Sequence, residues 1–235
     1  MQQLAKALDA MGIAYTEKTL EQFREYRRLV LEWNEKVNLT AIKDPEEFER
    51  KHFVDSVMAA QHPAFQKAQK IIDVGTGGGF PGVPLAILFP EKQFVLMDSL
   101  AKRVRIVEEM TAAIGLTNVT GIHGRAEDLG HMPQHREVYD LCCSRAVAAL
   151  PVLAEYCLPF VKVGGWFAPY KTGASLQEVE ESRKALAILG GRFKEETGPA
   201  IELPEDHRIF WIAKENKTGS KYPRKAGTPA KNPLK

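Results

Sequence analysis

The sequence lacks long apolar runs and a pattern of paired cysteines. No stretch of about 18 apolar residues occurs, so we expect no membrane-spanning helix. Residues 1–9 contain no apolar core of a signal peptide. The chain has three cysteines, Cys142, Cys143 and Cys157, with no C-x-x-C spacing. An odd number without that spacing argues against a disulfide framework and a zinc site. We therefore expect a cytoplasmic protein that binds neither metal nor membrane. A monomer is a separate expectation, on which these features have no bearing.

An excess of charge of one sign is nearly absent overall, but the charge is unevenly placed. The net charge is only +2. Residues 214–235 hold seven Lys or Arg and one Glu, so this segment carries +6 and the other 213 residues carry −4. A basic segment on a mildly acidic body indicates an anionic partner, with nucleic acid first. The alternative is a solvated tail without a partner. From residue 216 onward apolar residues are almost absent, which predicts a flexible tail.

The first 65 residues have the pattern of helices. Thr16 is a candidate N-cap, and Asp44-Pro45 followed by two Glu is a second helix start, for a helix that should run to about Ala60. Apolar positions recur every three or four residues, which places them on one helical face. These positions are Leu20, Phe23, Tyr26, Val30, Trp33 and Val37.

Strand-like and helix-like segments alternate from Lys70 onward, which predicts an α/β fold with a parallel sheet covered on both faces. The last two strands have no helix between them and should form an antiparallel pair at one edge. The predicted strands lie near 70–74, 94–98, 118–122, 138–143, 165–170, 192–196 and 208–214. The predicted helices lie near 82–89, 101–114, 148–159 and 175–189. We divide the chain into a helical extension (1–65), a ligand-binding domain (66–215) and a basic tail (216–235).

A glycine-rich loop follows the first predicted strand and precedes a helix. Glycines there let a ligand approach the backbone closely. The dinucleotide pattern G-x-G-x-x-G fits through Gly77, Gly79 and Gly82. The pattern acid-x-Gly-x-Gly-x-Gly, which resembles motif I of S-adenosylmethionine methyltransferases, fits through Asp73, Gly75, Gly77 and Gly79. We favour the methyltransferase, because an acid at Asp73 suits the cationic amino group of methionine and would repel a pyrophosphate.

Two further acids are candidates for binding the rest of the cofactor. Asp98 ends the second strand, where a carboxylate can accept both ribose hydroxyls. This fits NAD as well as S-adenosylmethionine, and the alternative is a helix N-cap. Resemblance to the methyltransferase class implies an adenine site at Ala126 and Glu127, although Glu127 could be only a helix-start acid. Phe80 is a candidate for lining the methionine or adenine pocket.

The substrate side lacks the motifs of two methyltransferase classes. The segment after the fourth strand, Ser144-Arg145-Ala146, has no Asn- or Asp-Pro-Pro-aromatic motif for exocyclic amines. Cys143 lacks the neighbouring proline typical of pyrimidine C5 methyltransferases, and a core position for Cys142 and Cys143 is the simpler interpretation. Guanine N7 remains as a candidate methyl acceptor. Its lone pair is free, so the reaction needs no general base, only alignment of N7 with the methyl group.

Basic residues at two strand ends are candidates for positioning the substrate. Arg145 and Lys171 should face the crevice at the carboxyl ends of the sheet, where they could hold phosphates or the O6 edge of guanine. The alternatives are an ion pair for Arg145 and a solvated lysine for Lys171. We assign no catalytic residue, and Arg145 and Lys171 are candidates for positioning the substrate only. His52, Asp55 and Ser56 share one helical face, for which we favour a buried network bracing the extension over a metal or triad site.

Taken together, these motifs resemble the bacterial family of 16S ribosomal RNA guanine-N7 methyltransferases. The resemblance spans nearly the whole chain through residues 33–40, 52, 55–56, 73–84, 98–103, 144–146 and 221–229. It implies a Rossmann-like class I fold, S-adenosylmethionine as cofactor, and 16S rRNA or the small ribosomal subunit or its precursor as partner.

The resemblance also assigns residues. It places cofactor contacts at Gly75, Phe80, Ala126, Glu127 and Arg145, and we add Gly77 and Asp98 from the loop and strand patterns. RNA phosphates would contact the tail, Lys102, Arg103, Arg145 and Lys171. One departure stands out, because family members usually have an acid directly before an Arg near the last strand. This chain has Asp206-His207-Arg208, so no RNA contact is assigned to Arg208.

Overall fold

The structure is a computed structural model that describes residues 1–172, 176–204 and 206–234. Its N-terminal part is helical, as the sequence predicts. The Thr16 side chain caps the second helix by accepting from the Thr19 N–H at 3.2 Å, and Asp44 Oδ1 accepts from Glu47 N at 2.8 Å. The elements are α1 (Gln2–Met11), α2 (Glu17–Asn34), α3 (Pro45–Phe48), the π-helix η1 (Glu49–Val54), α4 (Asp55–Val57), the 3-10 helix η2 (Met58–Gln61) and α5 (Pro63–Lys67).

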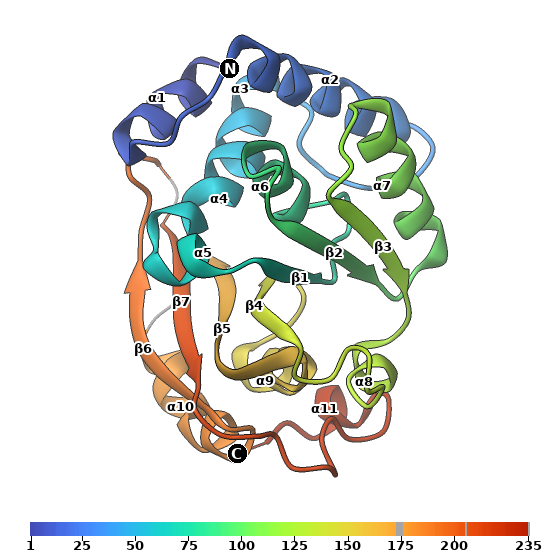
Figure 1. Ribbon diagram of the computed structural model, residues 1–235, viewed down its shortest axis with the longest axis vertical. Coiled ribbons are helices and arrows are strands. Elements are labelled where there is room, and N and C mark those ends of the chain that lie inside the picture. Colours follow the sequence, from blue (N-terminus) through green and yellow to red (C-terminus); the bar gives the residue numbers. More distant parts are fainter. Residues whose placement is uncertain (173–175, 205, 235) are drawn as a thin grey trace.

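A seven-stranded sheet runs through the molecule in the order β3-β2-β1-β4-β5-β7-β6 (Figure 1). The first five strands pair in parallel, and β7 is antiparallel to both β5 and β6. This confirms the predicted α/β class and its antiparallel edge. The strands are β1 (Lys70–Val74), β2 (Gln93–Asp98), β3 (Val119–His123), β4 (Tyr139–Arg145), β5 (Val161–Thr172), β6 (Gly191–Thr197) and β7 (His207–Lys214).

The remaining helices are close to those predicted, with two short additions, α8 and α11. They are α6 (Gly82–Leu88), α7 (Ala101–Ala113), α8 (Ala126–Leu129), α9 (Leu150–Cys157), the 3-10 helix η3 (Leu158–Phe160), α10 (Leu176–Ile188) and α11 (Thr228–Lys231). The start predicted at residue 175 lies outside the described residues. No helix in the described part of the chain is both long and apolar enough to span a bilayer.

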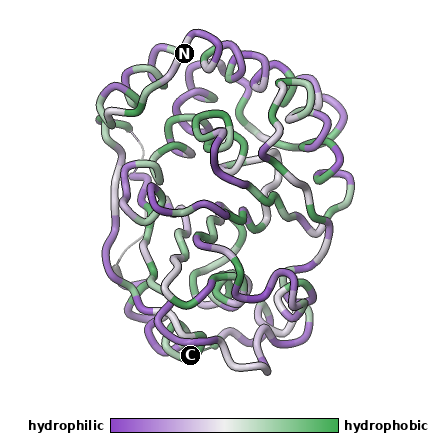
Figure 2. Tube along the Cα trace, viewed as in Figure 1, coloured by the Kyte–Doolittle hydropathy of each residue, from purple (hydrophilic) through white to green (hydrophobic). Residues whose placement is uncertain are grey.

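The core lies on both faces of the sheet. Ile71 faces a cluster that includes the N-terminal helices, α6 and α7, whereas Ile72 faces a cluster formed with α8, α9 and α10. Neighbouring residues of a strand point to opposite faces, so both are buried. Figure 2 shows the central strands largely in the hydrophobic colour. The strand order reverses between β1 and β4, and such a reversal places a ligand crevice at the carboxyl ends of the strands.

The basic tail packs on the domain, which differs from the flexible segment that the composition predicts. Tyr222 is buried, and Arg224 forms an ion pair of 2.7 Å with the fully buried Glu155 of α9. Arg136 donates to three carbonyl oxygens of the tail, those of Thr218, Gly219 and Tyr222. Composition failed here because the tail is held by backbone carbonyls and single side chains rather than by an apolar core of its own.

Candidate functional site

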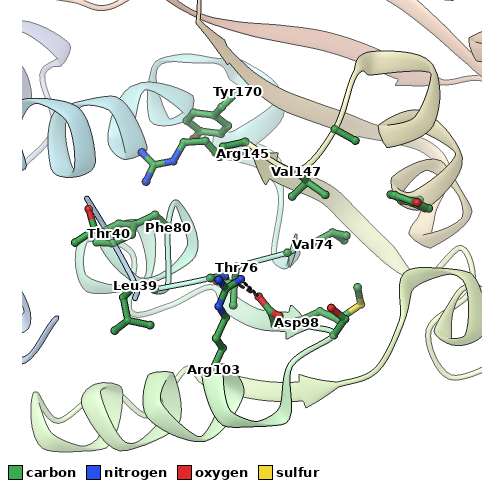
Figure 3. A pocket seen from close by; sticks show the side chains of 18 of the residues that line it. Leu39, Thr40, Val74, Thr76, Phe80, Asp98, Arg103, Arg145, Val147 and Tyr170 are labelled. Carbon is green, nitrogen blue, oxygen red and sulfur yellow. Dashed lines mark hydrogen bonds and ion pairs between the residues drawn. The ribbon is translucent and has the colours of Figure 1, made fainter. Parts of the chain in front are cut away.

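A cavity of about 1040 Å³ opens at the carboxyl ends of the central strands. Figure 3 shows Phe80 and Arg145 on the side of the N-terminal helices, and Asp98 with Arg103 on the side of α7. Two residues predicted to bind ligands, Asp73 and Lys102, are not in the cavity wall. The wall does include eight predicted residues from five separate parts of the chain: Gly75, Gly77, Phe80, Asp98, Ala126, Glu127, Arg145 and Lys171. The sequence therefore predicted a set of residues that the fold brings together.

The glycine loop owes its shape to backbone angles that L-residues rarely adopt. Gly75 has φ +75° and Gly77 has φ +59°. The N–H groups of Gly75 and Thr76 both donate to the carbonyl of Met97, each at 2.9 Å, which ties the loop to β2. A Cβ on Gly75 would lie 2.5 Å from Cγ2 of Val147. Position 75 is thus restricted to glycine by its backbone and by its neighbour.

Asp73 lies beneath this loop rather than in the cavity wall. Its side chain is buried, and Oδ2 accepts from Thr76 Oγ1 at 2.7 Å and from Gly82 N at 3.0 Å. Oδ1 has no hydrogen-bond partner, and burial raises the pKa of the carboxyl to about 6. Direct pairing of Asp73 with the amino group of methionine does not follow from this position. Asp73 instead joins the loop to the start of α6.

Asp98 ends β2 with its carboxylate in the cavity wall. Oδ2 accepts from Gly77 N at 3.0 Å, and Oδ1 accepts from Leu100 N at 2.9 Å. Arg103 Nη1 lies 3.7 Å from Oδ2. The alternative that Asp98 is the N-cap of α7 is wrong, because the N-cap is Leu100 and no side chain caps the helix. Each carboxylate oxygen of Asp98 has two lone pairs and uses one on an N–H donor, so each keeps one for a ligand.

Ala126 and Glu127 begin α8 and form the opposite end of the same wall. Glu127 is 7% exposed. Its Oε1 accepts from the N–H of Gly227, in the tail, at 2.9 Å. No local pattern connects these two positions, which lie 100 residues apart.

Arg145 joins the sheet to the N-terminal helices. Its Nη1 donates to Asp55 Oδ2 at 2.6 Å and to the Lys51 carbonyl at 3.0 Å, and its Nη2 lies 3.1 Å from His52 Nδ1. The guanidinium carbon lies 5.2 Å from the centre of the Phe80 ring. The two interpretations of Arg145, an ion pair and a position in the cavity wall, are therefore compatible, because the structure shows both.

His52 is held as a neutral imidazole. Burial, with the positive charge of Arg145 beside it, lowers its pKa to about 3. Its Nε2 lies 2.7 Å from Thr40 Oγ1, and the ring stacks on Phe80 with centroids 4.4 Å apart. Both ring nitrogens are thus already in hydrogen-bond contacts within the protein.

The network around Asp55 confirms the predicted bracing of the N-terminal helices. The hydroxyl of Tyr170, on β5, donates to the Ser56 carbonyl at 2.7 Å. Nδ1 of His207, on β7, lies 2.8 Å from Asp55 Oδ1. His207 is the residue at which the sequence departs from the pattern that it resembles, and it is buried, whereas Arg208 is partly exposed and pairs with Asp206. Among the described residues, no group of three or more His, Cys, Asp or Glu is placed to hold a metal.

Lys171 is in an ion pair, and the two neighbouring cysteines are in the core. Lys171 Nζ lies 2.7 Å from Glu178 Oε1 of α10, so the lysine is paired rather than solvated. Cys142 and Cys143 are buried in the sheet, and burial raises the pKa of both thiols well above the usual value. Neither thiol is available as a nucleophile at neutral pH.

Sequence reasoning missed two contributions to the cavity. Residues 39–42 line it, and the hydroxyl of Tyr26 donates to the Gly78 carbonyl at 2.5 Å, so the N-terminal extension forms part of the site. The tail was the second omission. Gly227-Thr228-Pro229 is a helix-start signal, with Pro at the first turn, and could have revealed α11.

Solved structures share the fold at low sequence identity. A putative O-methyltransferase from Klebsiella pneumoniae has a TM-score of 0.54 at 16% identity, with 81% of this chain and 90% of that chain covered. NSun6 from Pyrococcus horikoshii has a TM-score of 0.56 at 16% identity, with 76% and 57% covered. These similarities establish the fold alone.

Sequence relatives are far closer and span the chain. The ribosomal RNA small subunit methyltransferase G of Alkaliphilus oremlandii is 46% identical over 235 residues, which cover 99% of this chain and 98% of the relative. The enzyme of that name from an Exiguobacterium species is 47% identical with the same coverage. The family model described as rRNA small subunit methyltransferase G matches residues 19–200. The chain therefore belongs to the rRNA small subunit methyltransferase G family.

Proposed function

We propose that this protein transfers the methyl group of S-adenosylmethionine to N7 of a guanine in 16S ribosomal RNA. The observation that carries the proposal is that the glycine loop and Asp98 line the same cavity as Arg145 and Lys171. The relatives named above carry rRNA small subunit methyltransferase in their names, which supports 16S rRNA as the substrate class.

The cavity has the open backbone and the polar groups that the cofactor needs. Gly77 has no heavy atom within 4 Å of the position a Cβ would take, so its backbone is open to a ligand. Asp98 would accept the ribose hydroxyls, and Ala126 with Glu127 would hold the adenine. Gly75 and Phe80 would border the methionine part. When bound, the sulfonium supplies an activated methyl group, so the protein needs to supply only alignment.

The protonation states of the site favour a nucleophile that needs no deprotonation. His52, the imidazole nearest Arg145, has a pKa of about 3 and uses both ring nitrogens internally. Asp55 is paired with Arg145, and Glu178 with Lys171. None of these groups is placed as a general base for an amine or a C5 carbon. Guanine N7 already carries a free lone pair, so a site of this kind is sufficient for it.

Binding of the RNA would use the basic residues at the cavity. Arg103, Arg145 and Lys171 all line it. Their positive charge would hold phosphates or the O6 edge of guanine, and such binding weakens steeply with salt.

Two measurements test this proposal. Calorimetry should detect binding of S-adenosylhomocysteine and no comparable binding of NAD, and tight binding of NAD alone would reverse that assignment. Incubation with tritiated S-adenosylmethionine and either 16S rRNA or 30S subunits should place label in the RNA. Absence of label in both substrates would remove the proposed activity.

A further inference from the structure

We infer that the C-terminal segment is part of the cofactor site, because the backbone N–H of Gly227 positions Glu127 to select adenine by its exocyclic amine. This inference rests on the proposed function and adds a positioning residue to it. The contact on which it depends is the 2.9 Å hydrogen bond from Gly227 N to Glu127 Oε1. It adds a second role for the basic tail to the expected contact with RNA.

A side chain at the edge of a cavity can take several rotamers unless something fixes it. Glu127 is 7% exposed and lies on the short helix α8. The bond from Gly227 holds one carboxylate oxygen, which leaves the other for a donor within the cavity. The amine on C6 of adenine is such a donor, whereas an oxygen in that place would be repelled by the carboxylate.

Gly227 is itself held in place by anchors outside the cavity. Arg224 donates through both Nε and Nη2 to Glu155, and its backbone N–H donates to the same carboxylate at 2.8 Å. Tyr156, the next residue of α9, lines the cavity. Figure 1 shows α11 beside α8 and α9. The tail is therefore attached directly behind the wall that the adenine would contact.

Further contacts fix the path of the tail toward Gly227. His131, just beyond α8, has Nε2 2.6 Å from the Pro223 carbonyl oxygen. Thr218 donates its N–H to Glu137 Oε1 at 2.7 Å. Arg136 donates to three carbonyl groups of the tail. Together, these bonds attach the tail at several points along its length. A segment restrained in this way can hold Glu127 in one orientation, whereas a mobile one could not.

The test replaces Gly227 with valine in the full-length protein. Gly227 has φ +80°, and no heavy atom lies within 4 Å of its Cβ position. Gly227→Val introduces no clash, but a β-branched residue leaves this backbone region, and the N–H then moves away from Glu127. Gly164→Val is the matched control, because Gly164 has φ +86°, an equally open Cβ position and no place in the cavity wall.

The readout is the ratio of the dissociation constants of S-inosylhomocysteine and S-adenosylhomocysteine, which differ in oxygen or amine at C6. For the parent and for Gly164→Val, we expect the adenosyl compound to bind more tightly by at least ~10-fold, as for a hydrogen bond to a charged group. Gly227→Val should reduce that ratio to about 2-fold, chiefly by weakening the adenosyl compound. Arg224→Gln removes the bonds from the guanidinium to Glu155, and it should also reduce the ratio.

Two results would overturn the inference while leaving the proposed function intact. One is an unchanged ratio in both Gly227→Val and Arg224→Gln. The other is an equal loss of affinity for both compounds, since that would mean the tail supports the fold without orienting Glu127. Failure of the parent protein to bind S-adenosylhomocysteine would instead contradict the proposed function itself.

Discussion

Arg145 at the end of β4 forms an ion pair of 2.6 Å with Asp55 of the N-terminal extension, and 15% of the Arg145 side chain is exposed. The two residues are 90 positions apart. The pair joins the helical extension to the sheet at the rim of the cavity. The extension is therefore attached to the site itself, so a change in this pair should affect both stability and ligand binding.

Replacing Arg145 with methionine should lower the free energy of unfolding by about 3 kcal/mol, because a buried carboxylate then loses its main partner. Chemical denaturation at pH 7 measures the change. Arg183→Met is the control, because Arg183 forms an exposed pair with Glu180 and should change stability by no more than about 0.5 kcal/mol. Equal effects of the two substitutions would show that the Asp55 pair does not stabilise the extension.

Substitution of Gly75 should separate cofactor binding from backbone strain. Gly75→Val places a Cβ 2.5 Å from Val147 Cγ2, at φ +75°. We expect a loss of roughly 100-fold in affinity for S-adenosylhomocysteine, about 2.7 kcal/mol, from the displaced loop. Gly115→Val has nearly the same φ, +76°, and no neighbouring atom within 4 Å of the Cβ. Calorimetry should find parent-like affinity in that control, and unchanged affinity in Gly75→Val would mean that the loop is not the cofactor site.

The buried carboxyl of Asp73 should make stability depend on pH. Its pKa in the folded protein is raised by burial to about 6, from 3.8. A raised pKa stabilises the folded state fully below pH 3.8, and this contribution is lost as pH rises through about 6. Asp73→Asn cannot titrate. Relative to the parent, its free energy of unfolding should increase by about 3 kcal/mol between pH 4 and 7.

Denaturation curves of the parent and Asp73→Asn at a series of pH values measure this difference. The change should fall mainly between pH 4 and 6, the range between the two pKa values. A constant difference across the whole range would show that the Asp73 carboxyl is not perturbed by its environment.

Lys171 should affect RNA binding without affecting cofactor binding. Lys171→Gln removes a cation from the cavity wall, so the affinity for 16S rRNA should fall and the slope of log affinity against log salt should decrease by about 1. Lys162→Gln, at the other end of β5 and more than half exposed, is the control and should leave both unchanged. Filter binding over a salt series measures the slope. An unchanged slope, or a fall in affinity for S-adenosylhomocysteine, would contradict the role given to Lys171.

Much of the fold follows from local sequence patterns. The alternation of short apolar runs with amphipathic segments predicts all seven strands, since strand and helix periodicity are local properties. The Asp44-Pro45 cap predicts where the third helix begins. The cofactor side of the site could be predicted for the same reason, because the glycine loop, Asp98 and Glu127 each lie at or just after the end of a strand of the parallel sheet, and such strand ends converge.

Contacts between distant segments could not be predicted in this way. The bond from Gly227 to Glu127, the anchor of Arg224 on Glu155 and the position of His207 beside Asp55 join parts of the chain with no common local pattern. The direction in which the Asp73 side chain points could not be predicted from the sequence either. A carboxylate at a strand end can face a ligand or turn inward to N–H donors, and only the packed structure distinguishes the two.

The atom that receives the methyl group tests the central claim most directly. The RNA labelled by the full-length protein with tritiated S-adenosylmethionine would be digested to nucleosides and separated by chromatography with mass detection. A site that supplies alignment but no general base should yield 7-methylguanosine as the labelled nucleoside. Label in an N2- or N6-methylated purine, or in a C5-methylated pyrimidine, would contradict the account.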